Sequence, residues 1–214
     1  MLRSLALISL LAAMAPTASG QNLRLGKQGS SLLLGDISFS YTAKSSKRAG
    51  RVTESPDQTD LLIGPAYGYF VVNGLMLGVV LDYHRQTTTS VDNVTESTTQ
   101  GLLLGFRPAY YHPLMPSRAL QLYVRGLLGF AYDAAETLTT SNGVRSSATV
   151  KNTGFAGGIG AGVAFGFGAY WGGVLQLGVD YTYRGTSGSE AGSNVSVDYS
   201  EHIVSVGAAI GVYF

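Results

Sequence analysis

Three residues near the end of the chain, Asp198, Ser200 and His202, have the side-chain types of a hydrolytic site. They occupy every second position, so an extended strand would place them on one face. A histidine can activate a serine hydroxyl for attack on an ester, and a carboxylate can orient the histidine. Alternate residues on a strand lie about 7 Å apart, too far for a hydrogen bond, and nothing in the sequence supplies an oxyanion hole. The group defines an esterase hypothesis, while the sequence as a whole favours a protein that is not an enzyme, with no catalytic residue.

Charged residues also occur inside segments that are otherwise apolar. Arg107 and Arg125 fall at similar heights on two neighbouring predicted strands. Two unpaired guanidinium groups in a narrow interior would be costly, so we expect carboxylates to lie against them. The predicted interior charge network consists of Asp36, Asp82, Arg107, Arg125 and Asp180, with Arg184 as a further candidate.

No cofactor is expected. His84 and His112 have no carboxylate or cysteine partner at ligand spacing, so the sequence predicts no metal site. The glycine-rich segment contains neither of the two common phosphate-loop patterns.

The elements that must position these residues are indicated by a period of two. From Gly154 to Gly168 every second residue is glycine or alanine, and Phe155, Ile159 and Phe167 are among the residues between them. Such spacing puts small side chains on one face of a strand and large apolar ones on the other, which would meet lipid. The alternative is a membrane-spanning helix, because residues 152–179 carry no charge and contain glycines spaced by four. Glycine costs a helix about 1 kcal/mol per residue relative to alanine, which favours the strand.

Eight segments alternate in this way. They are residues 33–43, 60–72, 75–88, 98–112, 119–133, 151–168, 173–184 and 199–214. Short connections at 72–74, 112–118 and 169–172 alternate with long polar ones at 44–59, 89–97, 134–150 and 185–198. An Asn142-Gly143 pair in the third long connection is a hairpin signal. The fold expected is an all-β, eight-stranded antiparallel transmembrane up-and-down β-barrel.

Two details refine this barrel. Pro65 and Pro108 fall inside predicted strands, and each is expected to mark a bulge. Aromatic residues fall at two heights and predict girdles at the two membrane interfaces. The upper girdle contains Tyr41, Tyr83, Tyr132 and Tyr181, with Tyr183, and the lower one contains Tyr69, Tyr110, Trp171 and Phe214, with Tyr170.

The ends of the chain complete the expected organisation. A basic start, an apolar run and small residues before Gln21 predict a signal peptide over residues 1–20, removed by cleavage. Residues 21–214 then form one barrel domain, with strands from about residue 33. The last strand alternates up to Phe214 and is expected to pair with the first. With 14 basic and 13 acidic residues and no cysteine, the chain gives no sign of nucleic-acid binding or disulfides.

Three stretches carry a resemblance to a known family: the segment Gly64 to Gly78 with its tight turn, the strand Arg107 to Tyr111, and the terminal aromatic residue. Through them, residues 33–214 resemble the small outer-membrane β-barrel domain of Gram-negative bacteria, the OmpA/OmpX-like and porin-family group. The resemblance implies an outer-membrane location in a Gram-negative bacterium and contact with outer-membrane lipid and lipopolysaccharide. It also implies recognition of the C-terminal strand by the barrel-assembly machinery, and an extracellular protein or other surface ligand for the loops.

The sequence is compatible with three functions. The first is a structural or surface-binding role through four extracellular loops, with the lumen plugged by side chains, because an eight-stranded barrel is just wide enough for side chains to fill. The second is a narrow porin-like channel, which the small-residue face of 154–168 would allow. The third is a lipid A-modifying esterase built on Asp198, Ser200 and His202.

Overall fold

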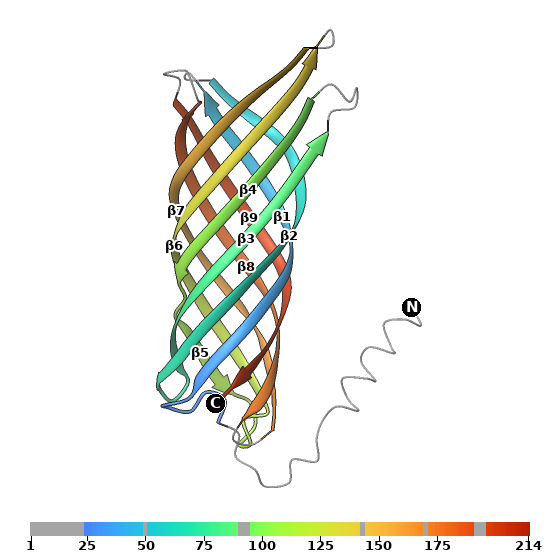
Figure 1. The fold of residues 1–214 in the computed structure, drawn as a ribbon. Coiled ribbons are helices and arrows are strands. Elements are labelled where there is room, and N and C mark those ends of the chain that lie inside the picture. The colour runs from blue at the N-terminus through green and yellow to red at the C-terminus, as the bar shows by residue number, and fades with distance from the viewer. Residues whose placement is uncertain (1–23, 49–50, 90–94, 142–143, 169–170, 191–195) are drawn as a thin grey trace, which may run out of the picture.

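A computed structural model describes residues 24–48, 51–89, 95–141, 144–168, 171–190 and 196–214. These residues form a tall cylinder of tilted strands (Figure 1). The predicted signal peptide, residues 1–20, lies outside them. In the described part of the chain, no helix is long and apolar enough to cross a membrane.

The described strands form one closed antiparallel sheet. Their bounds are β1 Ser31–Arg48, β2 Arg51–Val72, β3 Leu75–Thr89, β4 Thr95–Phe106, β5 Ala109–Pro113, β6 Leu120–Ser141, β7 Val144–Phe167, β8 Gly172–Glu190 and β9 Ser196–Tyr213. Neighbours in the chain pair with one another, except that β4 and β5 both pair with β3 and β6, and β1 pairs with β9 to close the ring. The predicted up-and-down barrel is therefore confirmed, and the helical alternative for residues 152–179 is wrong.

Strands β4 and β5 are two parts of one strand. Phe106 pairs with Leu128 and Ala109 pairs with Arg125, so the two paired strands contain the same number of residues across the break. Pro65 also lies in an unshifted register, opposite Gly35. The bulges expected at Pro65 and Pro108 are absent at both sites, because a proline removes a hydrogen-bond donor without adding a residue. The register shifts instead between Thr42 and Lys44 and between Phe70 and Val72.

The strands are longer than the sequence predicted. β6 and β7 pair as far as Ser141 opposite Val144, and β1 and β2 as far as Arg48 opposite Arg51. Most of the predicted loops 44–59 and 134–150 is therefore strand, because their threonine, serine and valine residues suit a hydrogen-bonded hairpin above the membrane. Asn142 and Gly143 lie outside the described residues, at the position where the sequence predicted the turn. We call this the hairpin end of the barrel, and the opposite end the short-turn end.

The strand pairing fixes the tilt and width of the cylinder. A path through paired residues that starts at Ile37 passes once around the ring and returns to β1 at Lys47, ten residues farther along. Such a stagger forces the strands to tilt, and barrels of this strand number tilt by roughly 35–45°. Figure 1 shows the tilt in every strand.

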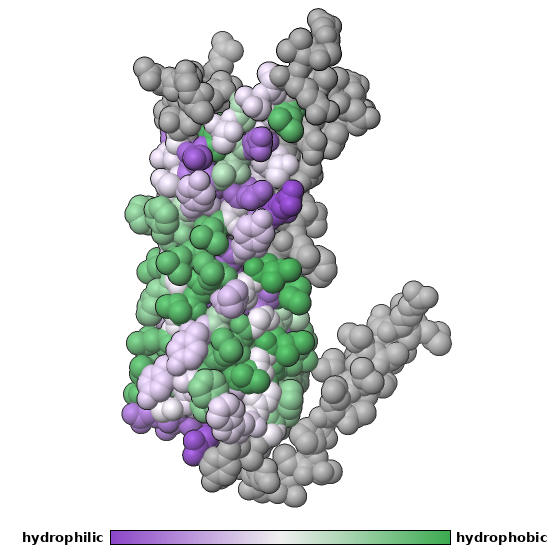
Figure 2. All heavy atoms as spheres, in the orientation of Figure 1, coloured by the Kyte–Doolittle hydropathy of each residue, from purple (hydrophilic) through white to green (hydrophobic). Residues whose placement is uncertain are grey.

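The outer face carries a broad apolar band. On the face shown in Figure 2, hydrophobic side chains form a band around the middle and lower part of the cylinder, and polar ones gather toward the hairpin end and along the rim of the opposite end. Phe155 is 76% exposed and Ile159 71% exposed, as expected for side chains that meet lipid. Others in this band are Ile63, Leu77, Val79, Leu104, Val124, Leu128, Val179, Val206 and Ile210.

The small-residue face of β7 points into the barrel, where it makes room for larger side chains. Gly162 pairs with Gly178 of β8, and both face the hydroxyl of Tyr123 from β6. A Cβ atom added at Gly162 would lie 2.7 Å from that hydroxyl oxygen. By contrast, Gly157 on the outer face has no atom nearer than 3.8 Å to such a Cβ. Glycine on the inner face therefore matches the volume of the side chains opposite.

This arrangement predicts unequal effects of two substitutions on one strand. Gly162→Leu overpacks the interior and should lower the free energy of unfolding by about 1–3 kcal/mol. Gly157→Leu adds an apolar side chain that faces lipid and should leave stability unchanged or raise it. Urea unfolding in lipid vesicles, followed by tryptophan fluorescence, measures both. An equal loss of stability in the two variants would contradict the assignment of the inner and outer faces of β7.

Candidate functional site in the barrel interior

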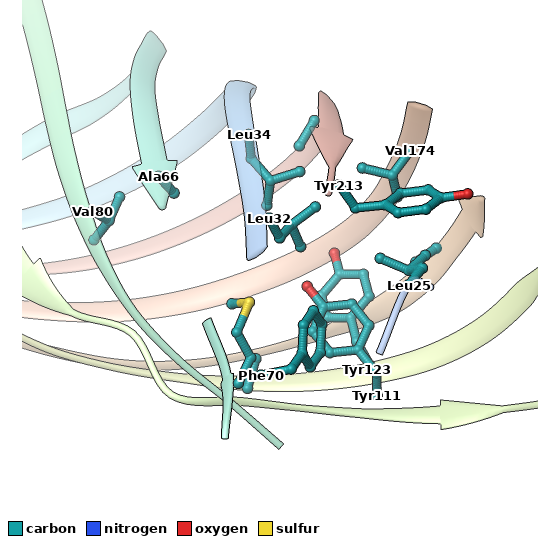
Figure 3. Close-up of a cluster of buried hydrophobic side chains, with 14 of the residues drawn as sticks. Leu25, Leu32, Leu34, Ala66, Phe70, Val80, Tyr111, Tyr123, Val174 and Tyr213 are labelled. Atoms are coloured by element: carbon teal, nitrogen blue, oxygen red, sulfur yellow. The ribbon is translucent and has the colours of Figure 1, made fainter. Parts of the chain in front are cut away.

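The half of the interior nearer the short-turn end is an apolar and aromatic core (Figure 3). The ring of Tyr111 lies 5.3 Å from that of Phe70 and 5.7 Å from that of Tyr123, centroid to centroid. Gln176 donates a 2.8 Å hydrogen bond to the Tyr111 hydroxyl, so this buried polar atom is satisfied. Large inward side chains also fill the lumen here, because they fit against the glycine face of β7.

The segment that precedes β1 closes the short-turn end of this core. Leu25 is fully buried, and its carbonyl oxygen accepts a 3.0 Å hydrogen bond from Gln121. The carbonyl oxygen of Gly26 accepts hydrogen bonds from the Arg118 guanidinium, at 2.7 Å, and from the Gly74 backbone, at 2.8 Å. Strands begin here at Ser31 rather than near residue 33, and sequence reasoning missed Leu25 because it precedes the alternating pattern.

Above the apolar core lies a layer of ion pairs. Arg107 pairs with Asp36 of β1, and Arg125 of β6 binds Asp180 of β8 through both oxygens, with Nε 2.6 Å from Oδ1. Bidentate pairing of this kind is strong and fixes the geometry of both groups. The Arg125 guanidinium also lies 5.4 Å from the centre of the Tyr123 ring, which joins the layer to the core.

The five residues of the predicted charge network share one cavity. Asp36, Asp82, Arg107, Arg125 and Asp180 all line it, and its volume is about 80 Å³. Such a polar space can hold a few water molecules. It is far smaller than a ligand pocket, which typically measures roughly 300–1,000 Å³.

A second charged cluster lies nearer the hairpin end. Arg184 of β8 is 3% exposed, and its guanidinium lies 3.1 Å from the Asp133 carboxylate and 3.9 Å from that of Glu201. His84 lies beside them, with Nδ1 3.4 Å from Arg184 and Nε2 3.9 Å from Asp133. The structure thus brings a carboxylate to His84, which has none at ligand spacing in the sequence. Sequence spacing cannot reveal contacts across the barrel, and the predicted network omitted Asp133 and Glu201, which the alternation of residues could have placed on inward faces.

The proposed esterase residues lie outside the barrel. Asp198 and His202 are exposed on the outer face of β9, and Ser200 between them is partly exposed. Nδ1 of His202 is hydrogen bonded to the hydroxyl of Tyr181, at 2.7 Å, and the ring of Tyr183 lies 5.2 Å from the imidazole. The group that orients His202 in the structure is thus a tyrosine rather than the carboxylate of a triad.

The aromatic residues predicted at the interfaces are exposed on the outer face wherever their side chains are described. These are Tyr69, Tyr83, Tyr110, Tyr132, Trp171, Tyr181, Tyr183 and Phe214. Trp171 and Phe214 stack on one another near the short-turn end, with ring centroids 5.2 Å apart. The side chain of Tyr41 and all of Tyr170 lie outside the described part of the structure.

The ion-pair layer makes a testable contribution to stability. Asp180→Asn leaves the Arg125 charge uncompensated in a mostly buried site and should lower the free energy of unfolding by about 3–5 kcal/mol. The double variant Arg125→Met with Asp180→Leu removes both charges, so its free energy of unfolding should fall by less than that of Asp180→Asn. Arg85→Gln, on an exposed outer position, serves as the control. Urea unfolding in vesicles gives the four free energies, and a double variant less stable than Asp180→Asn would argue against the pairing.

Comparison with known proteins supports the architecture. The structure of Ail from Yersinia pestis in complex with the heparin analogue sucrose octasulfate is 18% identical, covers 87% of this chain and 99% of its own, and has a TM-score of 0.50. OprG from Pseudomonas aeruginosa is 16% identical, with 88% and 98% covered and a TM-score of 0.50. No curated protein matches the sequence. The sequence model of the outer membrane protein beta-barrel domain matches residues 4–210. The chain belongs to this family of outer membrane β-barrel proteins.

Proposed function

We propose that this protein is a non-enzymatic outer-membrane barrel with a sealed lumen, which acts structurally or binds surface ligands through its long hairpins. The observation that carries the proposal is the filled interior. The apolar core, closed by Leu25, occupies one half, and the ion pairs Arg107–Asp36 and Arg125–Asp180 cross the middle. The space that remains between them is about 80 Å³, which supports a plugged barrel over a narrow channel.

The length of the strands supports a role for the hairpins. Beyond the aromatic residues of the upper girdle, β6 and β7 continue as a paired ladder to Ser141 and Val144. Their exposed residues in this region include Glu136 and Lys151, which suit water rather than lipid. Two hydrogen-bonded strands would hold a surface ligand site more rigidly than a loop would.

The remaining parts of the proposal concern export and chemistry. We infer that residues 1–20 are removed as a signal peptide, that the hairpin end faces the outside of a Gram-negative cell, and that the barrel-assembly machinery recognises β9. The alternating outward residues of β9, Val206 and Ile210 among them, suit such recognition. The hydrogen bond between His202 and Tyr181 supports a role without catalysis.

Electrical recording tests the sealed lumen. Pure protein in a planar bilayer should show no steady conductance, because the side chains of the described residues fill the lumen. The double variant Tyr111→Ala with Tyr123→Ala removes the aromatic part of the core and should conduct ions. Tyr110→Ala, on the outer face of β5, should show no conductance. A gel run before and after boiling checks that each variant is folded. Steady conductance of the wild-type protein would overturn the proposal in favour of a porin-like channel.

Cysteine labelling tests the orientation, because the chain contains no cysteine of its own. Glu136→Cys, near the hairpin end, should react on intact cells with a maleimide that cannot cross membranes. Met115→Cys, exposed between β5 and β6 at the short-turn end, should react only after the outer membrane is permeabilised. The reverse pattern would show that the hairpins face inward.

A further inference from the structure

The lipid-facing wall contains a groove that the sealed-lumen function does not explain. Its volume is about 690 Å³, and it crosses the outer face from β3 and β5 over β6 and β7 to β8. It is lined by the small residues Gly126, Gly160 and Ala161 and by larger ones such as Ile159 and Leu75. It is an open depression in the wall rather than an enclosed cavity.

The depression arises because the barrel wall lacks large side chains beside the break between β4 and β5. Gly126 of β6 lies beside Pro108, which separates β4 from β5, and a Cβ added to Gly126 would lie 3.4 Å from the Pro108 ring. Around this point Ile159 is 71% exposed and Val124 56% exposed. The depression therefore lies at the level where the outer wall meets acyl chains, and an acyl chain has the shape and polarity to fill it.

One end of the groove reaches a polar pair. Tyr181 lines the groove, and its hydroxyl forms the 2.7 Å hydrogen bond to Nδ1 of His202. When the tyrosine donates this bond, the imidazole carries its hydrogen on Nε2, and the protonated ring carries one there as well. His202 is exposed on the outer face, and the nearby Tyr183 ring packs against it. In both of these forms of the imidazole, Nε2 offers a hydrogen-bond donor at the girdle, next to one end of the apolar groove.

We propose that the groove and the Tyr181–His202 pair form a binding site for one phosphorylated, acylated lipid of the outer leaflet, namely lipid A. One acyl chain lies over Gly126, Gly160 and Ala161, and a phosphate oxygen accepts a hydrogen bond from Nε2 of His202. The choice of lipid A rests on the proposed outward orientation of the hairpin end, because the pair lies toward that end. The cysteine-labelling experiment tests this orientation separately, so failure of one proposal can be told from failure of the other.

Native mass spectrometry of the purified barrel tests the site. The protein is exchanged from nanodiscs that contain equal amounts of lipid A and phosphatidylglycerol into detergent, and the bound lipids are counted. Wild-type protein should retain about one lipid A per barrel. Ala161→Phe fills the groove and should reduce this retention by about tenfold or more, equivalent to at least about 1.4 kcal/mol. His202→Phe removes the phosphate donor and should reduce lipid A retention to the level of phosphatidylglycerol, because the single phosphodiester of phosphatidylglycerol is a weaker acceptor than the phosphomonoesters of lipid A.

The matched control is Ile63→Phe, which adds the same side chain to an exposed outer position of β2 that does not line the groove. It should retain lipid A like the wild type, and all variants should show the gel shift of a folded barrel. Equal retention by Ala161→Phe and Ile63→Phe would overturn the groove as a site. Unchanged retention by His202→Phe, or equal retention of both lipids by the wild type, would overturn the assignment of lipid A.

Discussion

A strand that crosses lipid must find protein partners for every backbone N–H and C=O group, because the hydrocarbon offers no water to replace them. Pairing of β1 with β9, from Leu32 opposite Tyr213 to Arg48 opposite Val197, removes the open edge of the sheet. Closure in turn fixes the tilt, the ten-residue stagger and the diameter of the ring. The narrow interior that results is the constraint on which side-chain placement depends.

Within that interior, volume and charge must be matched across the lumen. Tyr123 and Arg125 project from β6 toward β7 and β8, and Gly160, Gly162 and Gly178 provide the space that these side chains and the Asp180 carboxylate occupy. The glycine face of β7 is therefore the complement of a bulky face elsewhere, rather than an opening. The same matching explains why each arginine of the ion-pair layer has a carboxylate partner, since a charge in such a site without one would cost several kcal/mol.

The sequence predicted what depends on local alternation and missed what depends on contacts across the barrel. A period of two identified the strands, their outward faces and the inward positions of Asp36, Arg107, Arg125 and Asp180, because side-chain direction alternates along any strand. It did not predict the burial of Leu25, which depends on turns from distant parts of the chain. It also underestimated the strands beyond the membrane, where polar residues on both faces leave no hydrophobic alternation to follow. Register at the prolines likewise depends on the neighbouring strands.

The division of the barrel into a filled interior and two outer regions limits where binding can evolve. Substitutions in the lumen disturb ion pairs or packing and so affect stability first. On the outer wall, exposed side chains face lipid, and a change such as a proline or glycine can create a depression without loss of the fold. Above the membrane, the paired hairpins tolerate polar residues on both faces. We therefore infer that recognition in a barrel of this width belongs to the wall and the hairpins, and that the interior supplies the rigidity that holds both in place.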